Sequence, residues 1–233
     1  MEDFEKIIHS IKIATEKAGV KIVTGDTKVV ERGKGDKIYI NTSGIGVIYN
    51  NAKIGIEHIK PGQSILINGP IASHGMAIMS EREGLKFESE ILSDTKNLNF
   101  EVKKLIESFG EKIHFLRDAT RGGLASVLNE ITSESNLGIH LYEEKILVDS
   151  QVKSACELLG LDPMYVANEG LFLCVCDDDI ADEVLDTLHR VNHKASKIGF
   201  VTEEHASKVI MESAFGGKRV VNPLIGEQLP RIC

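Results

Sequence analysis

The sequence has little of what marks secreted, membrane-spanning or nucleic-acid-binding proteins. It has only 4 cysteines in 233 residues, without the spacing of a disulfide framework, so we expect reduced thiols in a cytoplasmic protein. Its longest apolar runs, such as residues 170–176, are strand-sized, which predicts no membrane span. Acidic residues outnumber basic ones by 35 to 27. This argues against nucleic acid as the main partner, because phosphate contacts need a basic face.

The remaining composition is typical of a soluble globular protein. Hydrophobic residues make up 42% and charged residues 27%, over a length that can bury a substantial core. The N-terminal stretch is acidic and amphipathic, unlike a secretory signal. Its apolar residues follow helical spacing at Phe4, Ile7, Ile8 and Ile11. Gly19 is placed to end this helix.

Three of the four cysteines have a simple packing explanation. Cys174 and Cys176 share one face of an apolar strand, and Cys156 lies in an apolar helical run. Free cysteine is among the most buried residue types, so we predict that these three pack in the core. Cys233 ends the chain in the segment LPRIC and has no such explanation. The tail could therefore be a reactive arm or an ordinary frayed terminus.

Apolar periodicity predicts that strands and helices alternate along the chain. The expected strands lie at residues 20–25, 36–48, 64–70, 171–176, 196–204 and 207–213. The expected helices lie at residues 4–18, 76–84, 101–110, 152–160 and 179–191 and within 112–135. This order indicates an α+β sandwich with helices on one face of the sheet. After Asn222 the sequence has two prolines and no periodicity, which is typical of a tail.

The segment RDATRGGL, residues 117–124, is the first candidate site. Gly122 and Gly123 open a helix after a polar cluster, so backbone N–H groups point out of the helix N-terminus. This geometry, with the helix dipole, suits a phosphate group. Asp118 could hold Mg²⁺ on that phosphate, because Mg²⁺ prefers oxygen ligands. An ordinary helix start with a glycine turn is the alternative, since such starts are common.

The segment VTGDTKVV, residues 23–30, is the second candidate. Asp26 and Lys28 interrupt an apolar strand, and burying them there is costly unless they pair or bind a ligand. Asp26 is therefore a candidate metal or phosphate-site ligand. Lys28 is a candidate counter-charge to phosphate or, if desolvated, a proton acceptor. The alternative is a tight bend whose charges reach solvent.

Two shorter motifs complete the set of candidates. Asn168 and Glu169 lie just before the strand at 171–176, where Glu169 is either a general base or a solvated strand-end carboxylate. Ser73 is the expected N-cap of a helix that carries His74 in its first turn. A ligand contact by His74 and simple helix capping are both open here.

In this order, the segments KIVTGDTKVV, SHGMAIMSEREG, LRDATRGGL, ANEG and LPRIC resemble the hydrogenase maturation protein family HypE. The resemblance extends over the whole chain. It implies membership of the superfamily of aminoimidazole ribonucleotide synthetase, selenophosphate synthetase and thiamine-monophosphate kinase. The fold it implies is a remnant of an N-terminal ATP-binding β-sheet domain at residues 1–56. An α/β-sandwich C-terminal domain at 57–221 and a flexible tail at 222–233 would follow.

The resemblance also implies a chemistry for the terminal cysteine. In the family this cysteine receives a carbamoyl group from HypF. ATP then activates the carbamoyl oxygen, which leaves as phosphate, so that a thiocyanate remains. The cyanide passes to iron on the HypC–HypD complex, for the active site of NiFe hydrogenase. Cys233 would be the carrier nucleophile of a cytoplasmic, homodimeric, ATP- and Mg²⁺-dependent enzyme.

The resemblance implies roles for particular residues. Lys28 and Glu169 would remove the amide protons during dehydration, and Asp26 and Asp118 would serve Mg²⁺. The implied ATP-contacting residues are Thr27, His74, Asp118, Thr120, Arg121, Gly122, Gly123 and Asn168. Ser73 departs from the family pattern, which usually has aspartate before the His-Gly of this helix.

The two ends of the chain carry further expectations. From Asn222 to Cys233 an extended chain reaches roughly 35 Å, so one thiol could visit both an internal ATP site and an external partner. The family continues further at the N-terminus, so the resemblance implies a truncated chain that begins inside the N-terminal domain. The strands at 20–48 would then expose apolar edges, and we expect poor solubility or altered association.

Three other functions fit part of the pattern. Another ATP-dependent kinase or synthetase of the superfamily would have no use for a terminal thiol. A non-catalytic carrier or docking module would keep the cysteine arm and accept a carbamoyl group without binding ATP. A purely structural α+β domain would leave the order of the motifs unexplained.

Overall fold

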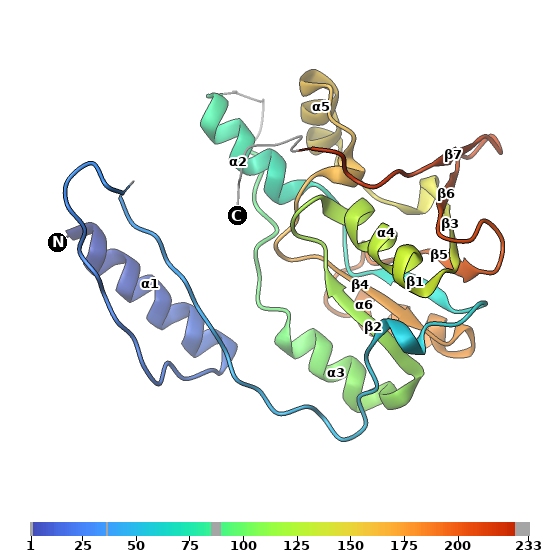
Figure 1. Ribbon diagram of the computed structural model, residues 1–233, viewed down its shortest axis with the longest axis horizontal. Coiled ribbons are helices and arrows are strands. Elements are labelled where there is room, and N and C mark those ends of the chain that lie inside the picture. The colour runs from blue at the N-terminus through green and yellow to red at the C-terminus, as the bar shows by residue number, and fades with distance from the viewer. Residues whose placement is uncertain (1, 36, 85–89, 227–233) are drawn as a thin grey trace. The chain divides into compact units, whose positions relative to one another are not determined.

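The computed structural model describes residues 2–35, 37–84 and 90–226 (Figure 1). The chain divides into two units, Met1–Asn50 and Asn51–Cys233. Cys233, the predicted carrier nucleophile, lies outside the described residues. No helix in the described ranges is both long enough and apolar enough to cross a membrane.

The first unit contains one helix, α1 (Glu2–Ala18). Its end has the hydrogen bonds of a Schellman motif: Gly19 N–H donates to Glu16 and Val20 N–H donates to Thr15. Gly19 has a φ of 68°, which glycine adopts without the steric cost of a side chain. The predicted helix and its glycine terminator are therefore confirmed.

The strands predicted at 20–25 and 36–48 do not form within the described part of the first unit (Figure 1). Neither segment has a partner strand among the residues that the structure describes, and a strand needs one to satisfy its backbone N–H and C=O groups. Their apolar side chains stay in solvent, with Val23 90% and Val47 95% exposed. The prediction was wrong because alternating apolar residues indicate a preference for strand structure, but they do not show whether a partner strand is present.

The second unit is built on a seven-stranded sheet of order β2-β4-β1-β5-β3-β6-β7. The strands are β1 (Ser64–Ile67), β2 (Ile113–Asp118), β3 (Gly138–Tyr142), β4 (Phe172–Cys176), β5 (Ser196–Thr202), β6 (Val209–Glu212) and β7 (Lys218–Val220). Neighbouring strands are antiparallel, except that β3 and β6 are parallel. The predicted strands at 64–70, 171–176, 196–204 and 207–213 are confirmed as β1, β4, β5 and β6.

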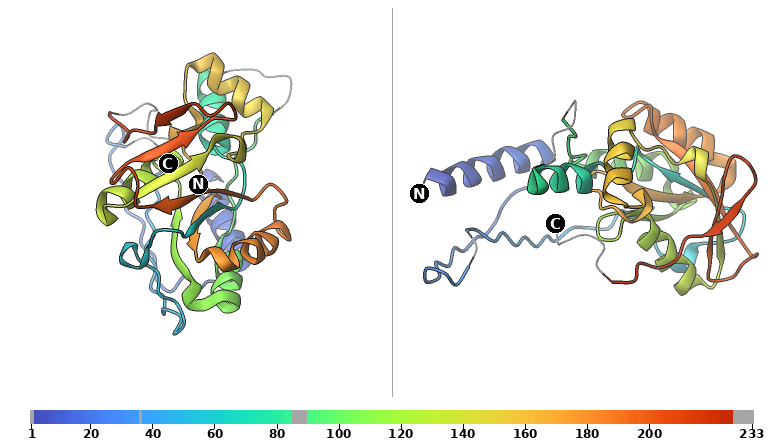
Figure 2. Two further views of the ribbon diagram at one scale, coloured as in Figure 1. Left: turned by 90° about the vertical axis from the view of Figure 1, so that its right-hand side faces the viewer. Right: turned by 90° about the horizontal axis from the view of Figure 1, so that it is seen from above.

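Helices pack on both faces of this sheet, which corrects the prediction of one covered face (Figures 1 and 2). The helices of the unit are α2 (Ser73–Glu83), α3 (Asn99–Phe109), α4 (Gly123–Ser135), α5 (Ser150–Leu159) and α6 (Ala181–His189). Side chains of α2, α4 and α5 share a core with Ile65 and Val175. Side chains of α3 and α6 share the other core with Leu66 and Cys174. Successive strand residues point to opposite faces, so β1 and β4 are buried on both sides.

The three cysteines predicted to lie in the core do so. Cys156, Cys174 and Cys176 are each at most 1% exposed. Burial raises the pKa of the Cys156 thiol to about 11, because a thiolate is disfavoured away from water. The class of the fold, α+β, is confirmed together with this core.

Candidate active site

Two segments that are far apart in the sequence meet where β2 ends and β4 begins. The strands are antiparallel, with Asp118 opposite Phe172, so the exit of one lies beside the entry of the other. The pairing continues past the strands: Ala119 N–H donates to Leu171 and Asn168 N–H donates to Ala119. The RDATRGGL turn and the ANEG loop therefore share one end of the sheet.

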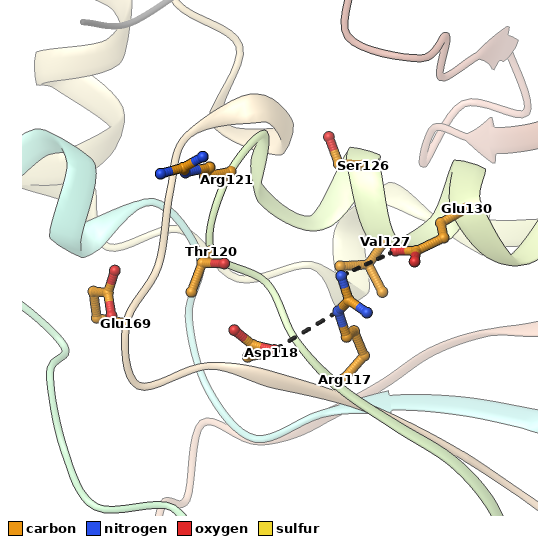
Figure 3. Close-up of a pocket in the computed structure, with 8 residues that line it drawn as sticks. All are labelled: Arg117, Asp118, Thr120, Arg121, Ser126, Val127, Glu130 and Glu169. Carbon is orange, nitrogen blue, oxygen red and sulfur yellow. Dashed lines mark ion pairs between the residues drawn. The ribbon is translucent and has the colours of Figure 1, made fainter. Parts of the chain in front are cut away.

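A cavity of about 400 Å³ opens at this place (Figure 3). Its lining combines residues of β2, the following turn, α4 and the loop before β4. The lining residues are Arg117, Asp118, Thr120, Arg121, Ser126, Val127, Glu130 and Glu169. Of the predicted site residues, the structure thus brings together Asp118, Thr120, Arg121 and Glu169.

The turn into α4 depends on two glycines with left-handed backbone. Gly122 has a φ of 72° and Gly123 a φ of 61°, a region that other L-residues enter at a steric cost. A Cβ on Gly123 would lie 2.6 Å from the carbonyl oxygens of Met164 and Val166. Gly123 N–H donates back to Thr120 over 3.0 Å, which tightens the turn. The side chains before the helix are therefore held close to its N-terminus.

The charges in the cavity are only partly paired. Arg117 lies 3.7 Å from Asp118 and 3.4 Å from Glu130 (Figure 3). Asp118 keeps 54% of its side chain exposed. Arg121 is exposed and makes no ion pair with any residue that the structure describes. One cation and one partly paired carboxylate are thus open to a ligand that carries both phosphate and a divalent ion.

Asn168 is fully buried and does not line the cavity. Its Oδ1 accepts from Ala72 N–H, and its Nδ2 donates to the carbonyl oxygens of Ala119 and Val166. These bonds occupy its amide within the fold. Asn168 therefore holds the loop in place. The side chain of its neighbour Glu169 reaches the cavity (Figure 3).

The start of α2 differs in detail from the sequence prediction. The N-cap is Ala72, with a φ of 76°, and Ser73 is the first helical residue, without a capping side-chain bond. The Ser73 prediction was wrong because Asn168 caps this end from a distant segment through Ala72 N–H. His74 is 8% exposed, with Nδ1 2.8 Å from Ser93 Oγ, and is not among the cavity-lining residues.

Asp26, Thr27 and Lys28 belong to the first unit, and their side chains are exposed. The Asp26 carboxylate accepts from Thr27 N–H at 2.8 Å. These residues lie in a segment without strand structure, so the expectation that they interrupt a buried strand was wrong. Their part in a site, like that of Cys233, stays a prediction.

Sequence reasoning missed Arg117, Ser126 and Glu130, which line the same cavity. Arg117 directly precedes Asp118, so its position just before the glycine turn could have predicted that it lines the site. Ser126 and Glu130 lie four residues apart on α4, so they share a face of that helix. The apolar stripe that predicts α4 lies on the opposite face of this helix and gives no indication of these two residues.

The fold and this site define a protein related to AIR synthase. The family described as "AIR synthase related protein, C-terminal domain" matches residues 60–212, and its N-terminal counterpart matches residues 1–48. Within that class the chain belongs to the carbamoyl dehydratase HypE family. It is 46% identical to carbamoyl dehydratase HypE of Bradyrhizobium diazoefficiens, over 99% of this chain and 67% of that protein. With its counterpart in Cupriavidus necator it shares 47% identity, over 100% of this chain and 67% of that protein.

Solved structures agree with this assignment. A crystal structure of hydrogenase maturation protein HypE in complex with ATP has a TM-score of 0.95 and 43% identity, over 100% of this chain and 71% of that one. The crystal structure of a HypE–HypF complex gives a TM-score of 0.92 and 46% identity, over 96% of this chain and 73% of that one.

Proposed function

We propose that this chain is an ATP-dependent carbamoyl dehydratase whose substrate is a carbamoyl group on its own Cys233. The single observation that carries the proposal is the cavity in which Thr120 and Arg121 of the turn before α4 come together with Asp118 and Glu169. Such a cavity offers a place for a phosphate beside a carboxylate that can take a proton. The relatives of this chain bear the name carbamoyl dehydratase.

The reaction removes the elements of water from an S-carboxamide. The group S–C(=O)–NH₂ on Cys233 becomes S–C≡N, while ATP becomes ADP and phosphate. The carbonyl oxygen takes the γ-phosphoryl group and leaves with it as phosphate, and the nitrogen loses both of its protons. The site must therefore bind polyphosphate, hold the carboxamide still and accept protons.

The turn before α4 supplies the polyphosphate site. The left-handed glycines Gly122 and Gly123 shape this turn, and Gly123 packs directly against the backbone of residues 164–166. The N-terminus of a helix favours negative charge, through its N–H groups and its dipole. Arg121 adds a cation that no described residue neutralises, and Thr120 lines the same cavity. The other members of the predicted contact set are not among the residues that line this cavity: Thr27, His74, Gly122, Gly123 and Asn168.

We propose that Asp118 serves Mg²⁺, and Asp26, in the separate first unit, stays a candidate ligand on the family resemblance alone. Among the described residues no group of three or more His, Cys, Asp or Glu side chains could hold a metal ion. Mg²⁺ does not require such a group, because it is bound through one or two carboxylates together with phosphate oxygens and water. When bound, the ion neutralises phosphate charge; Asp118, half-exposed at the cavity, would hold it there.

Glu169 and Lys28 are the proposed proton acceptors. Glu169 is partly buried and reaches the cavity from a loop whose backbone is fixed by hydrogen bonds. A carboxylate in that position can accept a proton from the carboxamide nitrogen. Lys28 would act in the same step only as the neutral amine, which requires a desolvated position.

The partners follow from the same proposal. HypF would donate the carbamoyl group; one relative of this chain was crystallised as a HypE–HypF complex. The HypC–HypD complex would accept the cyanide onto iron, with residues 222–233 as the arm that carries Cys233 between sites. We further propose a cytoplasmic location, since reduced thiols and an iron acceptor suit that compartment. The homodimer rests on the family resemblance alone.

Intact mass spectrometry tests the proposed function. The chain is incubated with HypF, carbamoyl phosphate, ATP and Mg²⁺, beside Cys233→Ala and Glu169→Gln variants. We expect one carbamoyl group to appear on Cys233 and then one water to be lost. Cys233→Ala should show neither change, and Glu169→Gln should accumulate the carbamoyl form.

Other outcomes identify the alternatives. A carbamoyl group that persists in the unaltered chain would mean a carrier module without dehydratase activity. No change on Cys233, with phosphate still released from ATP, would favour another ATP-dependent kinase or synthetase. Either result contradicts the proposed function.

A further inference from the structure

Asp94 makes an unusual pair of contacts with the loop that carries Glu169. Its Oδ1 accepts from Glu169 N–H at 3.1 Å, and its Oδ2 accepts from Gly170 N–H at 3.0 Å. One carboxylate therefore binds two consecutive backbone N–H groups. Hydrogen bonds to an ionised acceptor are among the stronger ones in proteins.

Asp94 approaches this loop from a different side than the candidate active site. It lines a second cavity of about 410 Å³, together with Gly170 and Lys96. Glu169 lines the first cavity. Asp94 and Gly170 do not line the first cavity, and Glu169 does not line the second.

Other polar groups of this loop are hydrogen-bonded as well. Asn68 Nδ2 donates to the carbonyl oxygen of Gly170, and Asn68 Oδ1 accepts from Phe172 N–H. Asn168 is fixed by its three buried hydrogen bonds. Glu169 is therefore the residue of this loop whose backbone is fixed while its side chain projects into the candidate active site.

Close packing supports the same geometry independently of the hydrogen bonds. A Cβ on Gly170 would overlap the carbonyl oxygen of Asp94. The two backbones touch at this point, so a glycine is required here by space, not by an unusual φ. Any side chain at 170 would push Asp94 and the loop apart.

We propose that Asp94 is a positioning residue for the dehydration step, because it sets the direction in which the Glu169 carboxylate enters the cavity. This inference rests on the proposed function of Glu169. Misplacing a catalytic group by about 1 Å can lower the rate by a factor of a hundred. Hydrogen bonds that fix the loop should therefore increase the rate of dehydration. Asp94 does not touch the reacting atoms; it acts through the backbone of Glu169.

The test compares Asp94→Asn with Glu169→Gln, the double variant and Gly170→Ala. Asparagine keeps the volume of Asp94 but replaces one acceptor oxygen by an NH₂ donor that faces a backbone N–H. Asp178→Asn is the matched control, because that carboxylate also accepts two hydrogen bonds, from Ser64 and Lys197, elsewhere in the fold. Single-turnover dehydration of carbamoylated chain is followed by mass spectrometry.

We expect Asp94→Asn and Gly170→Ala to slow dehydration by about 10- to 100-fold, with carbamoylation by HypF and the Kd for ATP unchanged. Asp178→Asn should keep the normal rate. In the Glu169→Gln background Asp94→Asn should have little further effect, because both changes remove the same contribution. A purely structural role would instead slow both backgrounds by the same factor, and that result would overturn the proposal.

A second measurement does not depend on activity. Hydrogen–deuterium exchange of the peptide 166–172 should become faster in Asp94→Asn and stay unchanged in Asp178→Asn. Unchanged exchange in Asp94→Asn would overturn the positioning role. A normal dehydration rate in Glu169→Gln would instead remove Glu169 from the proposed function. Slow dehydration in Glu169→Gln together with a normal dehydration rate in Asp94→Asn would refute only the positioning role of Asp94.

Discussion

Oδ1 of Asn168 accepts a 2.7 Å hydrogen bond from the backbone N–H of Ala72. Ala72 is the N-cap of α2 and has a left-handed backbone that is uncommon for alanine. The amide nitrogen of Asn168 bonds to Ala119, in the turn after β2. One buried side chain therefore joins the start of α2, the turn after β2 and the loop before β4.

Removal of this amide should destabilise the second unit. Asn168→Ala leaves the buried groups of Ala72 and Ala119 with fewer partners, and we expect a loss of at least about 2 kcal/mol in the free energy of unfolding. Urea denaturation measures it. Asn129→Ala is the control, because it also loses two bonds to backbone oxygens, those of Ala125 and Val221. Both variants should be less stable, but only Asn168→Ala should also weaken ATP binding.

The glycine turn predicts a contrast between two alanine substitutions. Gly123→Ala must adopt a φ of 61° and meets two carbonyl oxygens at 2.6 Å, so we expect a cost above about 2 kcal/mol. Gly216→Ala has a φ of 79° and no atom within 4 Å of the new Cβ, which leaves only the backbone cost of about 1–2 kcal/mol. Thermal denaturation compares them. Equal losses would mean that the backbone near Met164 yields to the new methyl group.

Arg121 should contribute to ATP affinity through its charge. Arg121→Ala removes a cation at the cavity, and we expect the Kd for ATP to rise about tenfold, the size of one charge-assisted hydrogen bond. Arg190→Ala is the control, because Arg190 is exposed at the end of α6 and does not line the cavity. Isothermal titration calorimetry at two salt concentrations measures both. A Kd unchanged by Arg121→Ala would exclude this arginine from phosphate binding.

The thiols should differ sharply in reactivity. Cys156, Cys174 and Cys176 are buried. Burial raises the pKa of Cys156 to about 11, and a hydrogen bond with Cys176, together with burial, raises the pKa of Cys174. Because the thiolate is the reactive form, a disulfide reagent at pH 8 should leave these three untouched in the folded chain. We expect one thiol, that of Cys233, to be labelled rapidly. The Cys233→Ala variant should show no rapid labelling. Rapid labelling of a second thiol would contradict the buried core.

The free energy of unfolding should depend weakly on the ionisation of the Asp178 carboxyl group. Hydrogen bonds from Lys197 and Ser64 lower the pKa of Asp178 below its ordinary value of 3.8. A lowered pKa in the folded state stabilises the fold above the ordinary value and loses this effect as the pH falls through the lowered one. The carboxylate is 63% exposed, so we expect less than about 1 kcal/mol. Asp178→Asn should therefore be less stable than the unaltered chain at pH 7, and this difference should shrink as the pH falls below 4.

The core of the site was accessible to sequence reasoning because its signals are local. The stripe of apolar residues predicts α4, and the glycine pair before it predicts the turn. Apolar continuity predicts β4, which places Glu169 at its entry. Antiparallel pairing of β2 with β4, which joins these pieces, came only from the structure.

The features that escaped prediction are those fixed by distant partners. The strands expected at 20–25 and 36–48 fail for lack of a partner strand. Ser73 has the chemistry of an N-cap, but the cap comes from Asn168 through the backbone of Ala72. Asp94 carries no local motif; its role appears only once its bonds to Glu169 and Gly170 are seen.

The contact between Gly123 and the segment 164–166 has a consequence for sequence variation. The atoms that crowd Gly123 are the carbonyl oxygens of Met164 and Val166, which every amino acid possesses. Side chains at 164 and 166 can therefore drift among apolar types without altering the turn, provided that the backbone keeps its path. Position 123 has no such freedom. Among homologues we thus expect an invariant glycine facing a variable segment, so that covariation would not reveal their contact.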